Sequence, residues 1–240
     1  MNSQEIKKTT KYIRLILIVA SFLVISVGSS LYFLSEKTDV YFSWTINPPL
    51  TAAYLGAGYL AAFVLEFLAS REKIWANARI AVPGVWAFTF LTLIVTLLHI
   101  DKFHFDAPAW ITVAGTWVWL LVYIIVPIVL LVFWFGQVRK PGVDPERKQT
   151  LPAWLRYSAL LQGGLLILSG VVMVLFPDQA IPLWPWKLSA LTSRAIGAWG
   201  IGNGVFTLQA FFENDWVRLR PFFPSWGMYG VLMLINVLIY

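Results

Sequence analysis

The chain has 240 residues, of which 59% are hydrophobic and 12% charged, and its mean hydropathy is +0.72. Soluble domains contain about 45–50% apolar and about 25% charged residues, so this composition excludes an ordinary water-soluble domain. The chain has no cysteine, which excludes disulfides, iron–sulfur clusters and thiolate metal sites. Its net charge of +6 is concentrated in particular loops, which indicates membrane topology rather than nucleic-acid binding.

Long apolar stretches follow one another through the whole sequence. The first is long enough to cross about 30 Å of hydrocarbon at about 1.5 Å per residue, and it is too long for a cleaved signal peptide. Backbone groups in lipid must be satisfied within their own segment, so these stretches are expected to be helices. We therefore predict an all-α integral membrane bundle of seven transmembrane helices, with spans at residues 12–34, 50–70, 79–100, 109–136, 155–176, 189–211 and 222–240.

The basic residues are unevenly distributed between the two sides of the predicted bundle. Of the 18 Lys and Arg residues, only Lys37, Lys102, Lys187 and Arg194 fall on the side opposite the N-terminus. Cytoplasmic loops carry the excess of basic residues in membrane proteins. This pattern predicts a multi-pass protein of the plasma (inner) membrane, with its N-terminus in the cytoplasm and its C-terminus outside.

The stretch Trp44–Arg79 recurs about 141 positions later as Trp186–Arg220. Chance rarely aligns charged residues, tryptophan and proline in register, so the recurrence indicates an internal duplication. We predict a single membrane domain, 1–240, in which repeat A (12–100) and repeat B (154–240) are joined by the fourth span and a cytoplasmic loop (101–153). Both three-helix repeats start on the same side, so they are parallel repeats. The matched pairs include Glu72/Glu213, Trp75/Trp216, Arg79/Arg220, Pro83/Pro224, Gly28/Gly170 and Arg14/Arg156.

Three polar residues within the predicted spans are candidates for a ligand site. Glu66 lies in the second span, where it could bind a proton or a cation, or pair with a basic residue at the cytoplasmic boundary. Arg194 lies one turn inside the sixth span, where it could bind an anionic group or extend its side chain to the interface. Asn203, farther along the same span, could contact a ligand or form an interhelical hydrogen bond.

The only two histidines lie close together where the third span ends. His99, Asp101, His104 and Asp106 carry imidazole and carboxylate groups, which are ligands for zinc, manganese or iron. Their spacing differs from that of a helical zinc site, and histidines five residues apart suit a bis-histidine haem poorly. A capped helix end beside interfacial aromatic residues is therefore the favoured interpretation, and no metal or haem cofactor is implied.

Two segments, Thr96–Asp106 (TLLHIDKFHFD) and Trp184–Gly204 (WPWKLSALTSRAIGAWGIGNG), resemble segments of a family of polytopic bacterial membrane proteins to which no activity is attached. The resemblance extends over most of the chain. It implies a membrane location and transfers no catalytic residue.

No catalytic set can be assembled from the sequence, which leans the interpretation away from an enzyme. We expect a non-catalytic structural or accessory subunit of a membrane assembly, whose partners are the lipid bilayer and other membrane subunits or further copies of the chain. The alternatives are a small carrier or ligand-binding protein with a site between the repeats, and a metal- or haem-dependent membrane enzyme. The basic connector at 139–148 alternates in sign and contains two prolines, so no nucleic-acid partner is expected.

Overall fold

The computed structural model describes residues 5–240; residues 1–4, the start of the predicted domain 1–240, lie outside the described part. The all-α prediction is confirmed for the described residues, which form helices and two isolated β-bridges. The α-helices are α1 (Lys11–Phe33), α2 (Thr38–Tyr41), α3 (Pro49–Arg71), α4 (Trp75–Ala78), α5 (Val82–Leu98), α6 (Trp110–Val138), α7 (Ala153–Leu175), α8 (Pro177–Ala180), α9 (Ala190–Glu213) and α10 (Phe222–Ile239).

Six helical segments of the described chain are long and apolar enough to cross a membrane. They are α1, α3, α5 with its preceding turns, α6, α7 and α10, and they make the chain a multi-pass membrane protein. The predicted span at 189–211 corresponds to α9, which has 24 residues but is not one of the six. Glycine, Asn203 and Gln209 lower its hydropathy, and neighbouring helices bury much of it, so little of it would need to contact lipid. A seventh span therefore stays a prediction.

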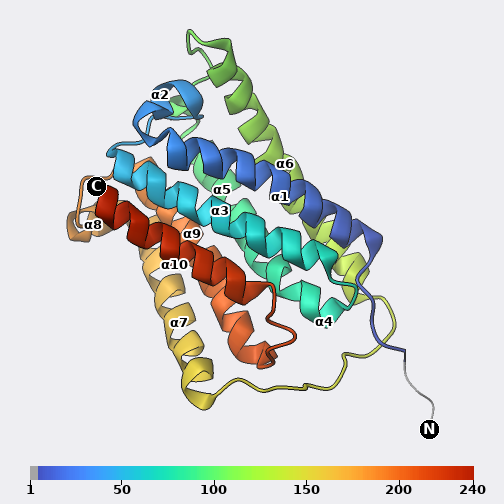
Figure 1. The fold of residues 1–240 in the computed structure, drawn as a ribbon. Helices are drawn as coiled ribbons and strands as arrows, with labels where there is room; N and C mark the ends of the chain where they lie inside the picture. The colour runs from blue at the N-terminus through green and yellow to red at the C-terminus, as the bar shows by residue number, and fades with distance from the viewer. Residues whose placement is uncertain (1–4) are drawn as a thin grey trace.

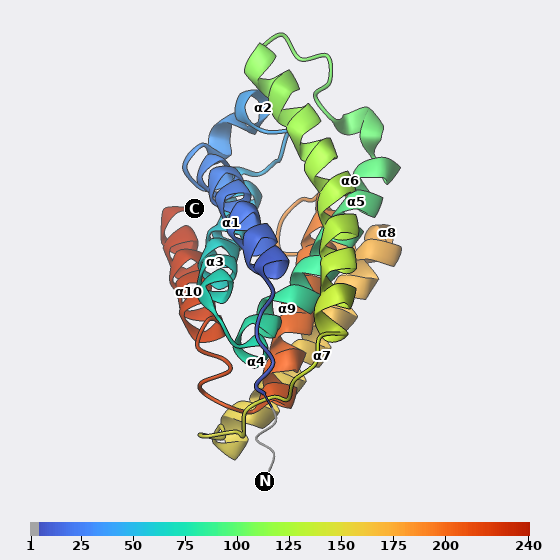
Figure 2. The ribbon, with the colours of Figure 1, turned by 90° about the vertical axis from the view of Figure 1, so that its right-hand side faces the viewer.

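The long helices form two layers (Figures 1 and 2). In one layer α1, α3 and α10 lie side by side, with α3 in the middle. The other layer contains α7, α9 and α5, with α9 in the middle. Helix α6 lies outside both layers and packs against α5 and α1. The central helices α3 and α9 meet where Gly58 faces the ring of Trp199.

Glycine allows the closest helix pairs to approach each other. A Cβ atom at Gly170 of α7 would lie 2.6 Å from the carbonyl oxygen of Gly197 in α9. A Cβ atom at Gly56 of α3 would lie 2.6 Å from the backbone nitrogen of Tyr32 in α1. Real Cβ atoms do not tolerate such distances, so these positions require glycine. Small residues that allow backbones to touch are typical of helix pairs in lipid, where dispersion replaces the hydrophobic effect.

The ends of the long helices are set by local chemistry. The Thr10 hydroxyl accepts a hydrogen bond from the backbone N–H of Ile13 and caps α1, and Ser189 caps α9 in the same way. Proline occupies the first position of α3, where its missing N–H costs nothing. Asn214 ends α9 with a φ of 44°, a left-handed conformation that asparagine tolerates.

Candidate functional site

Glu66 is a buried carboxyl group in the middle of the bundle. Only 3% of the residue is exposed, and its Oε2 atom has no hydrogen-bond partner among the described residues. It lines a cavity of about 40 Å³ together with aromatic residues of α5, α6 and α9, among them Phe88, Tyr123 and Trp199. A cavity of this size holds water but no organic ligand. Among the described residues Glu66 therefore forms no ion pair with the basic turn that follows α3, and it lies beside a small, mostly apolar space.

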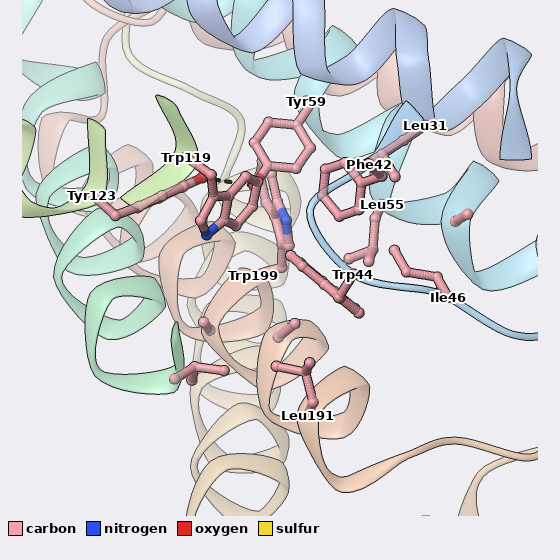
Figure 3. Packing of buried hydrophobic residues seen from close by; sticks show 14 of the residues in the cluster. Leu31, Phe42, Trp44, Ile46, Leu55, Tyr59, Trp119, Tyr123, Leu191 and Trp199 are labelled. Carbon is pink, nitrogen blue, oxygen red and sulfur yellow. Dashed lines mark hydrogen bonds between the residues drawn. The ribbon is translucent and has the colours of Figure 1, made fainter. Parts of the chain in front are cut away.

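Next to this cavity, α6 is anchored to the bundle by aromatic residues (Figure 3). The hydroxyl groups of Tyr59 on α3 and Tyr123 on α6 lie 2.7 Å apart and are buried. The Trp119 indole N–H donates a 3.1 Å hydrogen bond to the Thr96 hydroxyl of α5. Each of these polar groups is thus paired with another inside the bundle, as burial requires.

The ring of Trp119 sits in an aromatic cluster. Its centroid lies 5.2 Å from that of Phe42 and 5.1 Å from that of Trp44, and both pairs are edge-on. The Tyr59 ring also contacts it edge-on, at 6.3 Å. Edge-to-face pairs of this kind contribute about 0.5–1.5 kcal/mol beyond their burial. We call the space between α1 and α5 that α6 occupies in this way the first groove. Helix α6 does not fill it completely, because a cavity of about 400 Å³ remains between α1 and α6, with Phe42, Trp119 and Tyr123 among its lining residues.

A second space, of about 480 Å³, lies between α7 and α10, with α3 and α9 as its floor. We call it the second groove. Asn203 lies on its floor and Gln162 on its α7 side, and no charged residue lines it. Trp184 and Trp186 line it as well, with ring centroids 5.3 Å apart and an edge-on arrangement. The Trp184 indole N–H is buried without a hydrogen-bond partner in the described part of the chain.

Arg194 is engaged in contacts away from both grooves. Its Nη1 atom lies 2.8 Å from Nε2 of His99, and its Nε donates to the carbonyl oxygen of Val174 at 3.1 Å. A guanidinium can only donate, so this contact requires a neutral His99 ring with its proton on Nδ1. Glu66, Arg194 and Asn203 do not line one common cavity. Their joint role in ligand binding stays a prediction.

The four proposed metal ligands are not gathered into one site. Among residues 5–240, no three His, Cys, Asp or Glu side chains are placed to hold a metal ion together. The His104 ring binds the Thr45 hydroxyl at 3.1 Å and the Phe42 carbonyl oxygen at 3.0 Å, while His99 contacts Arg194. Asp101 pairs with its neighbour Lys102. Among the described residues, the Asp106 side chain takes no part in the hydrogen bonds around His104. These hydrogen bonds tie the loops at the ends of α2 and α5 together.

A network of buried ion pairs, which sequence reasoning missed, lies at the other end of the bundle. Glu213 is 5% exposed and binds two guanidinium groups, those of Arg79 and Arg218. Arg79 also contacts Asp144 of the connector, with 2.6 Å between the atoms. Glu213 thus joins Arg218, five residues away in its own turn, with Arg79, which lies 134 positions earlier in the sequence.

A related set of contacts surrounds Glu72. Its carboxylate accepts two hydrogen bonds from Arg220 and one from Asn77. Glu72 is 141 positions before Glu213, and Asn77 is 141 positions before Arg218. The repetition of Glu, Trp and Arg was the signal available in the sequence. It could not reveal that each carboxylate binds the arginine of the other turn.

Asp215 organises the connector beside this network. Its carboxylate accepts hydrogen bonds from four backbone N–H groups, those of Lys148, Gln149, Val217 and Arg218. Burial by itself raises the pKa of Asp215, but these hydrogen bonds outweigh it and hold the pKa below its ordinary value. The connector is therefore fastened to the turn between α9 and α10 by an ionised group.

No family model, curated protein or solved structure matches this sequence. The function must therefore be argued from the geometry of the bundle alone.

Proposed function

We propose that the chain is built from two three-helix repeats, α1–α3–α5 and α7–α9–α10, joined through α6. Reciprocal contacts support this: Arg79 of the first half binds Glu213, and Arg220 of the second half binds Glu72. The Arg14 side chain donates a hydrogen bond to the carbonyl oxygen of Ser70. Arg156, 142 positions after Arg14, donates to that of Phe211, which is 141 positions after Ser70. The glycine contacts repeat as well, since Gly28 approaches Gly56 as Gly170 approaches Gly197.

The proposed topology has seven spans, α9 included. Because the two layers exchange their outer helices, α9 packs between α7 and α5 as α3 packs between α1 and α10. A helix in that position needs the same length as its neighbours. The basic residues that precede α1 and follow α3, α6 and α9 support a cytoplasmic N-terminus and a C-terminus outside, in a bacterial inner membrane. Periplasmic and cytoplasmic thiol labelling of single cysteines in the loops of this cysteine-free chain tests the orientation.

For function, we propose a non-catalytic subunit of a membrane assembly. The observation that carries this is the second groove, an uncharged surface cavity of about 480 Å³ between α7 and α10 whose counterpart between α1 and α5 holds a helix. Extraction of the protein from its native membrane in mild detergent, followed by mass spectrometry of what migrates with it, tests the proposal. A stoichiometric membrane partner is expected. The proposal is contradicted if the protein migrates alone in every mild detergent tested.

The unpaired carboxyl group of Glu66 favours a second candidate, a small carrier that binds a proton. A buried ionisable group in a membrane bundle is costly and marks a functional site by default. The cavity beside it is large enough for water, which could carry the proton. Under this candidate, Glu66→Gln abolishes proton-coupled flux in liposomes, while Thr207→Val, at the matching position of the second half, leaves it unchanged. Equal flux in Glu66→Gln and wild type rules the site out.

A further inference from the structure

The two grooves have matching walls, which makes the first groove a guide to the second. The residues of the first groove recur in the second with an offset of 142 up to Trp44 and of 141 from α3 onward. The first member of each pair lines the small cavity beside Glu66, beneath α6, and the second member lines the second groove. The pairs are Ala20/Gln162, Val24/Leu166, Ala62/Asn203, Val85/Trp226, Phe88/Tyr229 and Thr89/Gly230.

The aromatic residues that receive α6 recur too. Phe42 and Trp44, which hold the ring of Trp119, correspond to Trp184 and Trp186. In the first groove the paired rings have centroids 4.5 Å apart, and in the second groove 5.3 Å apart. The second groove thus offers an aromatic corner of the kind that Trp119 occupies in the first.

The differences between the grooves indicate what the second one accepts. Where the first groove has Ala20 and Ala62, the second has the amides of Gln162 and Asn203. Each aromatic corner also has one buried indole N–H that lacks a partner within residues 5–240, that of Trp44 in the first groove and that of Trp184 in the second. A polar group facing these donors and acceptors would be satisfied inside the membrane. At Gly230, a Cβ atom would meet nothing within 4 Å, so this wall is open.

We propose that the second groove binds one transmembrane helix of a partner protein. The helix is apolar and uncharged on the docking face, because no charged residue lines the groove. It carries an aromatic side chain that packs against Trp184 and Trp186, and a hydroxyl or amide group one turn away. Helix α6 has this arrangement, with Trp119 and Tyr123 four residues apart. This inference rests on the proposed subunit function and names the kind of partner.

A synthetic peptide of α6, residues 110–138, is the probe that tests the groove. It is labelled with an acceptor dye and added to the full-length protein in lipid vesicles, with a donor dye on a cysteine introduced as Lys187→Cys. In the first groove the native α6 is tethered and outcompetes the peptide through its high effective concentration. We expect saturable energy transfer above that of a scrambled peptide. A peptide with Trp119→Ala is expected to bind about threefold to tenfold more weakly, which corresponds to the loss of one or two aromatic contacts.

Two matched variants locate the binding. A Cβ atom at Gly230 meets nothing within 4 Å, so Gly230→Phe is expected to place its ring in the groove and to abolish transfer. Gly227→Phe lies on the same helix, is equally open at its Cβ, and does not line the groove, so it should bind like wild type. Equal transfer in the two variants overturns the proposal. Self-association of the labelled protein that is lost only in Gly230→Phe also overturns it, because the occupant would then be a second copy of the chain. If the wild-type protein shows no saturable peptide binding, the proposal is overturned as well, because lipid would then be the occupant.

The same variants separate this inference from the subunit function. In the native membrane, a partner that co-migrates with wild type and Gly227→Phe but not with Gly230→Phe supports both. A partner that co-migrates equally with all three supports the subunit function and overturns the groove as its binding site. Saturable peptide binding without any co-migrating partner supports the helix-binding groove and overturns the subunit function.

Discussion

The first and second grooves have matching walls and different contents. In the first, α6 packs against α5 and α1 and leaves a cavity of about 400 Å³ beside Trp119 and Tyr123, whose polar groups are paired with Thr96 and Tyr59. In the second, Trp184, Gln162 and Asn203 face a cavity of about 480 Å³. Under the proposed duplication, α6 packs on the surface of the first half, whereas the matching surface of the second half faces outward. Prediction of the effects of substitutions must therefore treat matching positions separately.

The largest expected difference between the halves concerns their ion pairs. Glu213→Gln leaves the buried guanidinium group of Arg218 and the partly buried one of Arg79 without their shared carboxylate, which should cost about 3–5 kcal/mol. Glu72→Gln should cost less, about 1.5–3 kcal/mol, because the Arg220 side chain is 59% exposed and water can replace the contact. The free energy of unfolding in mixed micelles with increasing SDS measures both. Glu146→Gln, at an exposed position, is the control; equal costs for the two buried glutamates would contradict the network described here.

The next prediction compares the aromatic corners. Trp119→Ala should destabilise the protein by about 3 kcal/mol, the low end of the range for large-to-small substitutions, because lipid rather than water replaces part of the lost contact. Trp184→Ala should cost about 1 kcal/mol or less, because the residue is only partly buried and packs against one other ring, that of Trp186. The same unfolding assay measures both variants. A greater cost for Trp184→Ala would mean that the second corner is not open.

Much of this fold could be predicted from the sequence, because the relevant signals are local. Apolar length sets the helices, and proline and hydroxyl residues set their ends. The recurrence of Glu72 and Arg79 as Glu213 and Arg220 is the basis of the duplication, which stays a prediction. The exchange of partners between these pairs could not be predicted, because it depends on the packing of segments about 140 residues apart. The sequence also could not decide whether Glu66 is buried or paired with a basic residue, since distance along the helix says nothing of which neighbours cover a side chain.

A smaller effect is expected from filling each groove with the same side chain. Thr89→Phe should lower the free energy of unfolding by about 1–3 kcal/mol, because Thr89 is buried beneath α6 and the larger ring must push α6 aside. Gly230→Phe should be neutral or stabilising by about 0.5 kcal/mol, because the site is open and glycine disfavours helix. Thermal unfolding midpoints of the two variants in the same detergent provide the comparison. A destabilised Gly230→Phe protein would show that the second groove is closed.

The smallest effect concerns acid. The folded pKa of Asp215 is lowered, so its ionised carboxylate contributes stability above its unfolded pKa of about 3.9, and this contribution is lost as pH falls toward the lower folded pKa. Asp215→Asn should therefore be less stable than wild type near neutral pH, and its stability should fall less steeply below about pH 4. Unfolding midpoints measured against pH test this. Asp178→Asn, at an exposed position in α8, should leave the wild-type pH profile unchanged; a parallel profile for Asp215→Asn would contradict the role given to the carboxylate.

The comparison of the grooves can be tested most directly with single cysteines, because the chain has none of its own. The matching positions are Thr89→Cys in the first groove and Gly230→Cys in the second, with Gly227→Cys as an accessible reference. Their rates of reaction with a small apolar thiol reagent in detergent micelles are compared with the rates of the unfolded proteins. We expect Gly230→Cys to react at nearly the rate of Gly227→Cys, and Thr89→Cys to react at least about tenfold more slowly, corresponding to an opening cost above about 1.4 kcal/mol. Equal rates at positions 89 and 230 would contradict the claim that position 89 is covered beneath α6 while position 230 is open.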